Sequence, residues 1–421
     1  MLYARWQQIA SAHRQEVALV DLAADRRWTF QQLQNEAEKT NRAGGAVAFP
    51  QGLSTEFIVT VLQGWRREQV VCPLEEGQAP FVLSELPAGC VHLKSTSAST
   101  GRRRFVAFTG GQLAADADQI VATMGLRQDW PNLGVISLAH SYGFSNLVLP
   151  LLLHGIPLIL ARSPLPETLR QAATLFGAMT VPAVPALWRA WFEADAIAGN
   201  VSLAISAGAP LPIALEAAVY AERGLKLHNF YGASECGGIA YDRSDRPRTD
   251  GTSVGSAMTG VDLSVNADGC LEIFSRAVGL SYWPEPTPSL SPGRYQTSDL
   301  AEVIDGIVHL RGRQSDLINI AGRKVLPESI ERALATHPLV ADCLVFGVPS
   351  PDLDRAEIVV ACVAARSETS PEALKQHLLQ LLPAWQIPRD WWFLPGLVAN
   401  ERGKLSRREW RQKYLERAQP D

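Results

Sequence analysis

Short apolar runs alternate with amphipathic stretches along the first half of the chain. Residues 47–49 and 70–74 are apolar and short enough to be strands, and residues 56–65 between them carry apolar side chains at helical spacing. The order strand, helix, strand is typical of parallel strands joined by helices. The pattern therefore predicts an α/β fold.

The same alternation continues to about residue 230. Further strands are expected at 17–22, 105–108, 135–138, 157–160, 179–181 and 203–206. Thr29 is a suitable cap for a helix that begins at Phe30. The most apolar run, 148–161, is too short to span a bilayer and contains Pro150 and Pro157, so it predicts a buried helix end, a turn and a strand.

The pattern changes twice in the second half of the chain. From Gly251, short strands alternate with glycines, which predicts an antiparallel β subdomain at about 251–311. Beyond it, two helices are expected at 327–337 and 371–382, with two strands between them. We therefore expect a large N-terminal domain over residues 1–313 and a small, mobile α+β domain over 314–421.

Composition narrows the class of protein. The chain has 421 residues, 47% hydrophobic and 19% charged, with a net charge of −4, which suits a soluble protein and gives no reason to expect a nucleic-acid partner. Six scattered cysteines, none in a Cys-x-x-Cys pair, are typical of reduced thiols. With no signal peptide and no membrane span in the pattern, a cytoplasmic location is expected.

A loop rich in hydroxyls and arginines precedes the predicted strand at 105–108. Its first part is Thr96, Ser97, Ala98, Ser99, Thr100 and Gly101, and three arginines follow at 102–104. Backbone N–H groups, hydroxyls and guanidinium groups together suit a polyphosphate. The loop is not the Gly-x-x-x-x-Gly-Lys-Ser/Thr motif of P-loop proteins. A solvated Ser/Thr loop beside a basic patch remains the alternative at this point.

Six further motifs follow in order, and with the loop they resemble the acyl-adenylating superfamily of acyl- and aryl-CoA ligases, luciferases and peptide-synthetase adenylation domains. The loop is similar to the family's phosphate loop. The other segments that carry the resemblance are His140–Gly143, Ser206–Leu211, Tyr231–Glu235, Tyr295–Leu300, Gly312–Asp316 with Gly322, and Gly403–Arg407. Any one match is weak, whereas seven in the family's order, spread over the chain, are specific.

The resemblance implies roles in binding ATP. Thr96, Ser97, Ser99, Thr100, Gly101 and Arg104 would hold the β- and γ-phosphates, with Ser234 as a further donor. Glu235 would hold Mg²⁺, which prefers carboxylate oxygen. Asp299 and Arg313 would bind the ribose. The adenine pocket would be formed by Ala207, Gly208, Ala209, Asn229, Phe230, Tyr231 and Gly232.

It also implies the catalytic and acyl-binding residues. Lys404 would neutralise charge in the transition state, together with Glu235, Ser234 and Arg104. Ser315 would be the hinge of the C-terminal lid domain that carries this lysine. The acyl pocket would be lined by His140, Phe144, Cys236, Gly237 and Gly238.

Plainer structural roles remain open for several of these residues. Glu235 and Arg313 could be members of surface ion pairs, Asp299 a turn-forming residue, Ser315 a loop serine, Tyr231 a core aromatic residue and Lys404 an ordinary surface lysine. The chain also departs from the family's pattern. Ala98 replaces a glycine, Arg104 a lysine, and the segment between Pro73 and Thr96 is several tens of residues shorter than usual.

The implied reaction is ATP-dependent activation of a carboxylic acid, followed by transfer to a thiol. No acidic residue follows His140 closely to pair with an α-amine, so an aryl or medium-chain acid is expected rather than an amino acid. The acceptor is CoA or the phosphopantetheine of an acyl carrier protein. The alternative of another class is a non-catalytic nucleotide-binding protein derived from the family.

Overall fold

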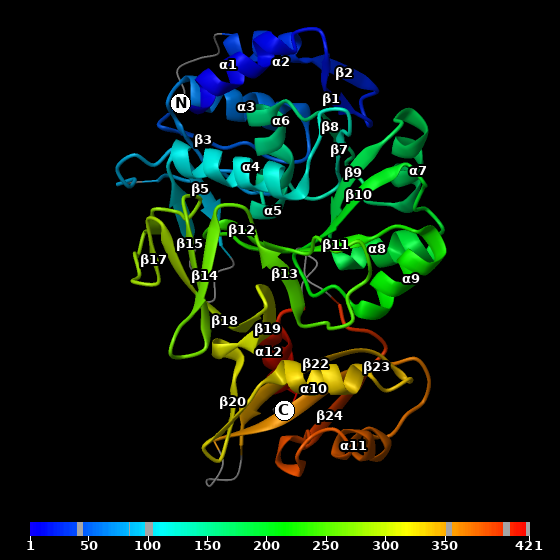
Figure 1. The fold of residues 1–421 in the computed structure, drawn as a ribbon. Helices are drawn as coiled ribbons and strands as arrows, with labels where there is room; N and C mark the ends of the chain where they lie inside the picture. The colour runs from blue at the N-terminus through cyan, green and yellow to red at the C-terminus, as the bar shows by residue number, and fades with distance from the viewer. Residues whose placement is uncertain (40–44, 84, 97–103, 351–355, 399–404, 418–421) are drawn as a thin grey trace. The chain divides into compact units, whose positions relative to one another are not determined.

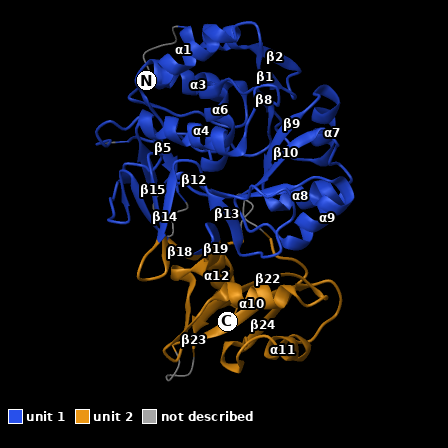
Figure 2. Cartoon of the chain, viewed as in Figure 1, with its two compact units in different colours: residues 1–264, 272–297, 303–308 blue, residues 265–271, 298–302, 309–421 orange. Residues whose placement is uncertain are grey.

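The computed structural model divides the chain into two compact units (Figure 2). It describes residues 1–39, 45–83, 85–96, 104–350, 356–398 and 405–417. The first unit consists of residues 1–264, 272–297 and 303–308, and the second of residues 265–271, 298–302 and 309–421. Four strands have residues in both units: β14 (Val261–Val265), β15 (Cys270–Ser275), β18 (Arg294–Ile304) and β19 (Ile307–Arg313).

A largely parallel sheet forms the centre of the first unit (Figure 1). Its parallel strands, in spatial order, are β11 (Leu227–Ala233), β10 (Val201–Ser206), β9 (Met179–Ala183), β7 (Asn132–Gly134), β8 (Leu158–Leu160) and β1 (Val17–Asp21). Antiparallel strands continue it at both ends: β12 (Gly237–Tyr241) and β13 (Ser253–Ala257) beside β11, and β2 (Arg26–Thr29) beside β1. The predicted α/β fold is confirmed.

A smaller sheet in the same unit carries the hairpin around the predicted phosphate loop. Its order is β16 (Ser281–Trp283), β6 (Phe105–Phe108), β5 (His92–Ser95), β4 (Val70–Val71) and β3 (Val47–Ala48). β5 and β6 pair in antiparallel register, and β16 pairs with β6. All four residues of β6 are buried, because the strand lies inside the sheet and packs on both faces.

Helices connect and cover these strands. They are α1 (Leu2–Ala12), α2 (Phe30–Glu38), α3 (Thr55–Arg66), α4 (Gly110–Met124), α5 (Ser141–Gly143), a π-helical turn (Phe144–Val148), α6 (Leu149–His154), α7 (Pro166–Leu175), α8 (Pro185–Glu193) and α9 (Ile213–Arg223). Thr29 caps α2 as predicted, since its hydroxyl accepts a hydrogen bond from the Gln32 backbone and the Gln32 side chain accepts from the Thr29 backbone. The apolar run at 148–161 is, as predicted, a buried helix, a turn at Gly155 and a strand.

One predicted strand was wrong. The structure has no strand at 135–138; the strand lies earlier, as β7 at Asn132–Gly134. The shift occurs because Asn132 and Gly134 occupy ladder positions opposite Leu158 and Leu160, where burial is decided by neighbouring strands and not by local hydrophobicity.

The second unit has its own apolar core. It contains a three-stranded sheet of β22 (Val340–Pro349), β23 (Glu357–Ala365) and β24 (Asp390–Leu394), with the small hairpin β20 (Ile318–Ile320) and β21 (Arg323–Val325). Its helices are α10 (Pro327–Ala335), α11 (Pro371–Leu379) and α12 (Arg407–Arg417). Ile330, Leu334, Leu374 and Leu378 from α10 and α11 are fully buried against this sheet. Across the described part of both units, no helix is long and apolar enough to cross a bilayer.

Candidate functional site

The turn after β10 lies beside Asn229 of β11. The two strands are parallel, and Ser206 is in register with Asn229. Ala207 is buried and Gly208 has a φ of 87°, a conformation that favours glycine. Ligands of open α/β sheets bind at the carboxyl ends of parallel strands, so this turn and Asn229 are placed to form one pocket wall.

The segment from His140 to Gly143 approaches the same edge of the sheet. A Cβ on Gly143 would lie 2.0 Å from the Ser137 carbonyl oxygen, so only glycine fits there. The Tyr142 ring lies 5.9 Å from the Phe230 ring, centroid to centroid, and its hydroxyl is 3.5 Å from the carbonyl oxygens at the ends of β9 and β10. This places the Tyr142 hydroxyl beside the Ala183 carbonyl oxygen, which also accepts a hydrogen bond from the Ala207 backbone at the start of the predicted adenine turn.

His140 has an acidic partner that the sequence did not reveal. Its Nε2 lies 3.0 Å from Oε1 of Glu75, and the Ser137 hydroxyl donates to the same carboxylate at 2.9 Å. Glu75 lies in the unusually short segment after Pro73, 65 positions before its partner. Because Glu75 and His140 are so far apart in the chain, no local pattern indicates this pair.

Glu235 and Arg104 are connected through Tyr282. Glu235 lies in the tight turn between β11 and β12, and its Oε1 accepts a hydrogen bond of 2.9 Å from the Tyr282 hydroxyl. The Arg104 guanidinium stacks on the Tyr282 ring at 3.4 Å from its centroid, and it donates to Thr287. The predicted metal-binding carboxylate and the predicted phosphate-binding arginine therefore contact the same aromatic side chain, the first at its hydroxyl and the second at its ring face.

Burial and charge act together at this connection. Burial and the neighbouring Glu235 carboxylate raise the pKa of Tyr282. The same causes, in the same order, raise the pKa of Tyr295, which also hydrogen-bonds to Tyr282. Both phenols therefore remain neutral donors at physiological pH. Tyr282 was not a predicted site residue. Its position follows from the pairing of β16 with β6, the strand after the phosphate loop, and this pairing is seen only in the structure.

The ends of the predicted phosphate loop are tied together. The Thr96 backbone N–H and hydroxyl both donate to the Arg104 carbonyl oxygen, at 2.9 and 3.1 Å. The hairpin β5–β6 thus brings the two ends of the loop to one point. The loop residues Ser97, Ser99, Thr100 and Gly101 lie outside the described residues, as does Lys404.

A buried ion pair lies behind the turn that carries Glu235. Lys94 Nζ is 3.3 Å from Asp116 Oδ2 and 2.9 Å from the Ser145 hydroxyl oxygen. Asp116 Oδ1 accepts a weak hydrogen bond of 3.4 Å from the Gly238 backbone and lies 1.9 Å from where a Cβ of Gly237 would be. Gly237 is therefore required by this close approach.

The remaining predicted acyl-pocket residues are internal. Cys236 is fully buried, and burial with the nearby carboxylates of Glu235 and Asp116 raises the pKa of its thiol. Phe144 is 1% exposed, and its ring packs 4.3 Å from that of the buried His92. A protonated thiol and a packed aromatic ring can form a pocket wall but supply no nucleophile.

Two predicted ribose ligands form a pair in the second unit. Arg313 Nε donates to Asp299 Oδ1 at 2.9 Å, with the arginine side chain 59% exposed. The ion pair considered for Arg313 is thus present, and its partner is the other predicted ribose ligand. Ser315, the predicted hinge residue, lies in a single 3-10 turn, Gln314–Asp316, and its hydroxyl donates to Asp316.

Comparison with known proteins places these features in context. The AMP-binding enzyme family matches residues 89–274, and the AMP-binding enzyme C-terminal domain matches residues 329–404. A probable 2-succinylbenzoate–CoA ligase of Mycobacterium tuberculosis is 30% identical over 74% of this chain and 82% of its own length. Anthranilate–CoA ligase of Pseudomonas aeruginosa is 28% identical over 94% of this chain and 80% of its own.

The same fold is present in solved structures. ATP-bound MatB from Rhodopseudomonas palustris superposes with a TM-score of 0.87 over 99% of each chain, at 19% sequence identity.

Proposed function

Because the chain belongs to the AMP-binding enzyme family, we propose that it uses ATP to activate a carboxylic acid and then transfers the acyl group to the thiol of CoA. The family predicted from the sequence is confirmed, and with it the prediction of an AMP-forming ligase. The observation that supports the proposed chemistry most is the connection of Arg104, Tyr282 and Glu235.

The first half-reaction joins the acid to AMP. A carboxylate oxygen attacks the α-phosphorus of ATP, and pyrophosphate leaves with the electron pair of the broken P–O bond. Such chemistry depends on positioning and on neutralising charge. Arg104 and the hydroxyls of the phosphate loop (Thr96, Ser97, Ser99 and Thr100), together with Ser234, would hold the departing phosphates, and Lys404 would stabilise charge near the α-phosphate.

Glu235 fits a magnesium ion held jointly with the triphosphate. It supplies one carboxylate, and Mg²⁺ is usually bound by one or two carboxylates plus phosphate oxygens and water. The ion would supply positive charge to the phosphates. The Tyr282 hydroxyl helps to fix the orientation of this carboxylate through a hydrogen bond of 2.9 Å to Oε1.

The nucleoside would be recognised by the residues that the family's motifs assign to it. The turn Ala207–Ala209 and the segment Asn229–Gly232, including Tyr231, would bind adenine, with the Asn229 carboxamide reading its amine. Asp299 and Arg313 would bind the ribose. In the second half-reaction the CoA thiolate attacks the acyl carbon and AMP leaves. We propose that the domain beyond residue 313 turns about Ser315 between the two steps, which removes Lys404 from the site.

An aromatic acid is the substrate class best supported. Two relatives named above are ligases of aryl acids, 2-succinylbenzoate and anthranilate. The predicted acyl wall also carries an aromatic residue, Phe144, and His140, which is paired to Glu75.

A panel of aryl and medium-chain acids, supplied with ATP, Mg²⁺ and CoA and analysed by mass, tests this proposal. We expect an acyl-CoA from at least one aryl acid, and none from the Lys404→Ala variant. Substituting the neighbouring Arg408, which is exposed, by Ala serves as the matched control and should retain activity. If product forms only when a carrier protein replaces CoA, the acceptor is the carrier protein. If the protein binds ATP but forms no product, the non-catalytic alternative is supported.

A further inference from the structure

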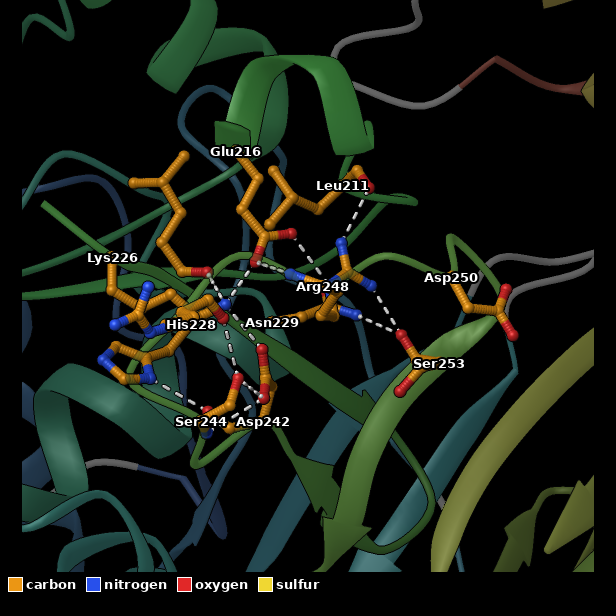
Figure 3. Close-up of polar contacts among 12 residues, drawn as sticks. Leu211, Glu216, Lys226, His228, Asn229, Asp242, Ser244, Arg248, Asp250 and Ser253 are labelled. Carbon is orange, nitrogen blue, oxygen red and sulfur yellow. Dashed lines mark hydrogen bonds and ion pairs between the residues drawn. The ribbon is translucent and has the colours of Figure 1, made fainter. Parts of the chain in front are cut away.

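Four charged side chains form a buried cluster in the first unit (Figure 3). They are Glu216 from α9, Lys226 just before β11, Asp242 just after β12 and Arg248 from the following loop, and each is at most 8% exposed. Lys226 Nζ contacts Glu216 and lies 2.6 Å from Asp242 Oδ2. Arg248 Nε donates to Glu216 Oε2 at 2.9 Å. Two cations thus balance two anions, and none of the four is used by the chemistry above.

Arg248 extends from this cluster to the end of the turn after β10 and to the carbonyl group beside Asn229. Its Nη2 donates to the Leu211 carbonyl oxygen at 2.9 Å, where the turn after β10 ends. Its Nη1 donates to the Ser253 carbonyl oxygen at 2.5 Å. The same Ser253 oxygen accepts a longer hydrogen bond, 3.4 Å, from Nδ2 of Asn229 (Figure 3). One guanidinium therefore holds the turn and the carbonyl to which the Asn229 amide is directed.

The direction of the Asn229 amide decides which base it can read. With its nitrogen turned toward Ser253, the carboxamide presents its oxygen as the other polar end, which accepts a hydrogen bond. The 6-position of adenine carries an amine donor, whereas hypoxanthine and guanine carry a carbonyl acceptor there. An amide fixed in this direction thus favours adenine over a 6-oxo purine.

We propose that Arg248 is a positioning residue for base selection, acting through the Leu211 and Ser253 carbonyls on the adenine turn and on Asn229. The proposal rests on the proposed function, since it takes Asn229 as the group that contacts the base. An arginine suits the role because its planar fork donates in several fixed directions at once, which lysine does not. Glu216 stabilises the buried guanidinium and sets its orientation through two further contacts, to Arg248 Nε and to its backbone N–H.

Two double variants separate this role from simple structural support. Glu216→Gln with Arg248→Met removes one ion pair together with the two carbonyl contacts. Lys226→Met with Asp242→Asn removes the other pair of the same cluster and leaves both carbonyl contacts in place. Each leaves one buried cation with one buried anion, so the two should lose comparable stability, which thermal unfolding checks.

The measurement compares ATP with ITP, both by calorimetric binding and by acid-dependent pyrophosphate exchange. We expect E216Q/R248M to weaken ATP binding and to lower the preference for ATP over ITP by about tenfold, because one oriented hydrogen bond is lost. The KM for the acid should stay within about twofold, as should the ATP preference of K226M/D242N. The single variant R248K should have a preference for ATP over ITP between those of the wild type and E216Q/R248M.

Equal loss of preference in the two double variants, or an unchanged preference in E216Q/R248M, would overturn the proposal. The calorimetric binding measurement tests the role of Arg248 independently of the proposed ligase activity. If the wild type binds ATP over ITP but shows no exchange with any acid, the ligase activity fails while the role of Arg248 is still decided. A wild type that binds ATP and ITP equally overturns the role of Arg248 whether or not it is active.

Discussion

Each unit contains a cluster of charged side chains, and the two clusters differ in burial and in the balance of positive and negative charges. In the first unit, Lys226 and Arg248 face Glu216 and Asp242, two charges of each sign. In the second unit, Arg407 alone faces three carboxylates, with contacts of 2.9 Å to Asp316, 2.8 Å to Glu328 and 2.6 Å to Glu331. The residues of the first cluster are at most 8% exposed, whereas the side chains of the second are 18–26% exposed, so burial and charge balance both affect how the acids ionise.

One acid of the first cluster and two acids of the second have pKa values that shift in opposite directions. At Asp242, burial raises the pKa, but hydrogen bonds from Lys226 and Ser244 outweigh it, and the net shift is downward. At Glu331, burial raises the pKa to about 7, although Arg407 opposes the shift. Glu328 is also shifted upward, first by burial. Hydrogen bonds from Lys226 and Ser244 thus keep Asp242 charged, whereas burial leaves Glu331 partly protonated near neutral pH.

The largest expected effect comes from unbalancing the first cluster. Glu216→Gln leaves two buried cations with Asp242 alone, which should lower the free energy of unfolding by about 3–5 kcal/mol. Chemical denaturation of both proteins at pH 7 measures the difference. Glu222→Gln on the exposed face of the same helix is the matched control and should change stability by less than about 0.5 kcal/mol. Equal stabilities for the two variants would show that the cluster is not a coupled charge network.

The pH dependence of the second unit is the next largest effect. The pKa of Glu331 is raised from 4.5 to about 7 in the folded protein, so the folded state holds a proton that the unfolded state has released. The contribution of this group therefore favours folding below about pH 4.5 and is lost as pH rises to about 7, a fall of up to about 3 kcal/mol. Asp242, with its lowered pKa, adds no slope in that range.

Hydrogen exchange of peptides from β22 and β23, measured between pH 5 and 8 and corrected for intrinsic exchange, tests this slope locally. Local exchange is preferable to whole-chain unfolding because a chain of two units need not unfold in one step. Glu331→Gln should flatten the profile, since the titrating group is gone. Parallel profiles for wild type and variant would refute the assignment to Glu331.

The smallest expected effect has the opposite sign to that of Glu216→Gln. Glu328 Oε2 is buried and has no hydrogen-bond partner, while Oε1 contacts Arg407. Glu328→Gln keeps an acceptor for Arg407 and removes one excess charge, so it should be neutral or stabilising by about 1 kcal/mol at pH 8. Thermal unfolding at pH 8 measures it. A loss as large as that of Glu216→Gln would remove the distinction between the clusters.

Features that depend on neighbouring residues in the chain could be predicted from the sequence, whereas contacts between residues far apart in the chain could not. The cap at Thr29 follows from residues close in sequence and was predicted correctly. Tyr282 touches Glu235 across 47 positions, and Arg248 reaches Leu211 across 37. No periodicity marks such pairs, because they form only when strands from separate parts of the chain come into register.

Residues of the same type also have different roles, according to the side chains that they contact. Glu75, Glu216 and Glu235 are chemically alike, yet one pairs with a histidine, one with two cations and one with a tyrosine. Only Glu235 lies in a motif of the family, so only it was predicted. The fold class could be inferred from patterning, whereas the supporting residues of the site required the tertiary contacts.

Acid-dependent exchange of labelled pyrophosphate into ATP, measured without CoA, tests the central claim most directly, because it reports the first half-reaction alone. The account predicts exchange with an aryl acid, lost when Glu235 is replaced by Gln and reduced when Tyr282 is replaced by Phe, since the phenol orients the carboxylate. An absence of exchange across aryl and medium-chain acids, in a protein that binds ATP, would contradict the account.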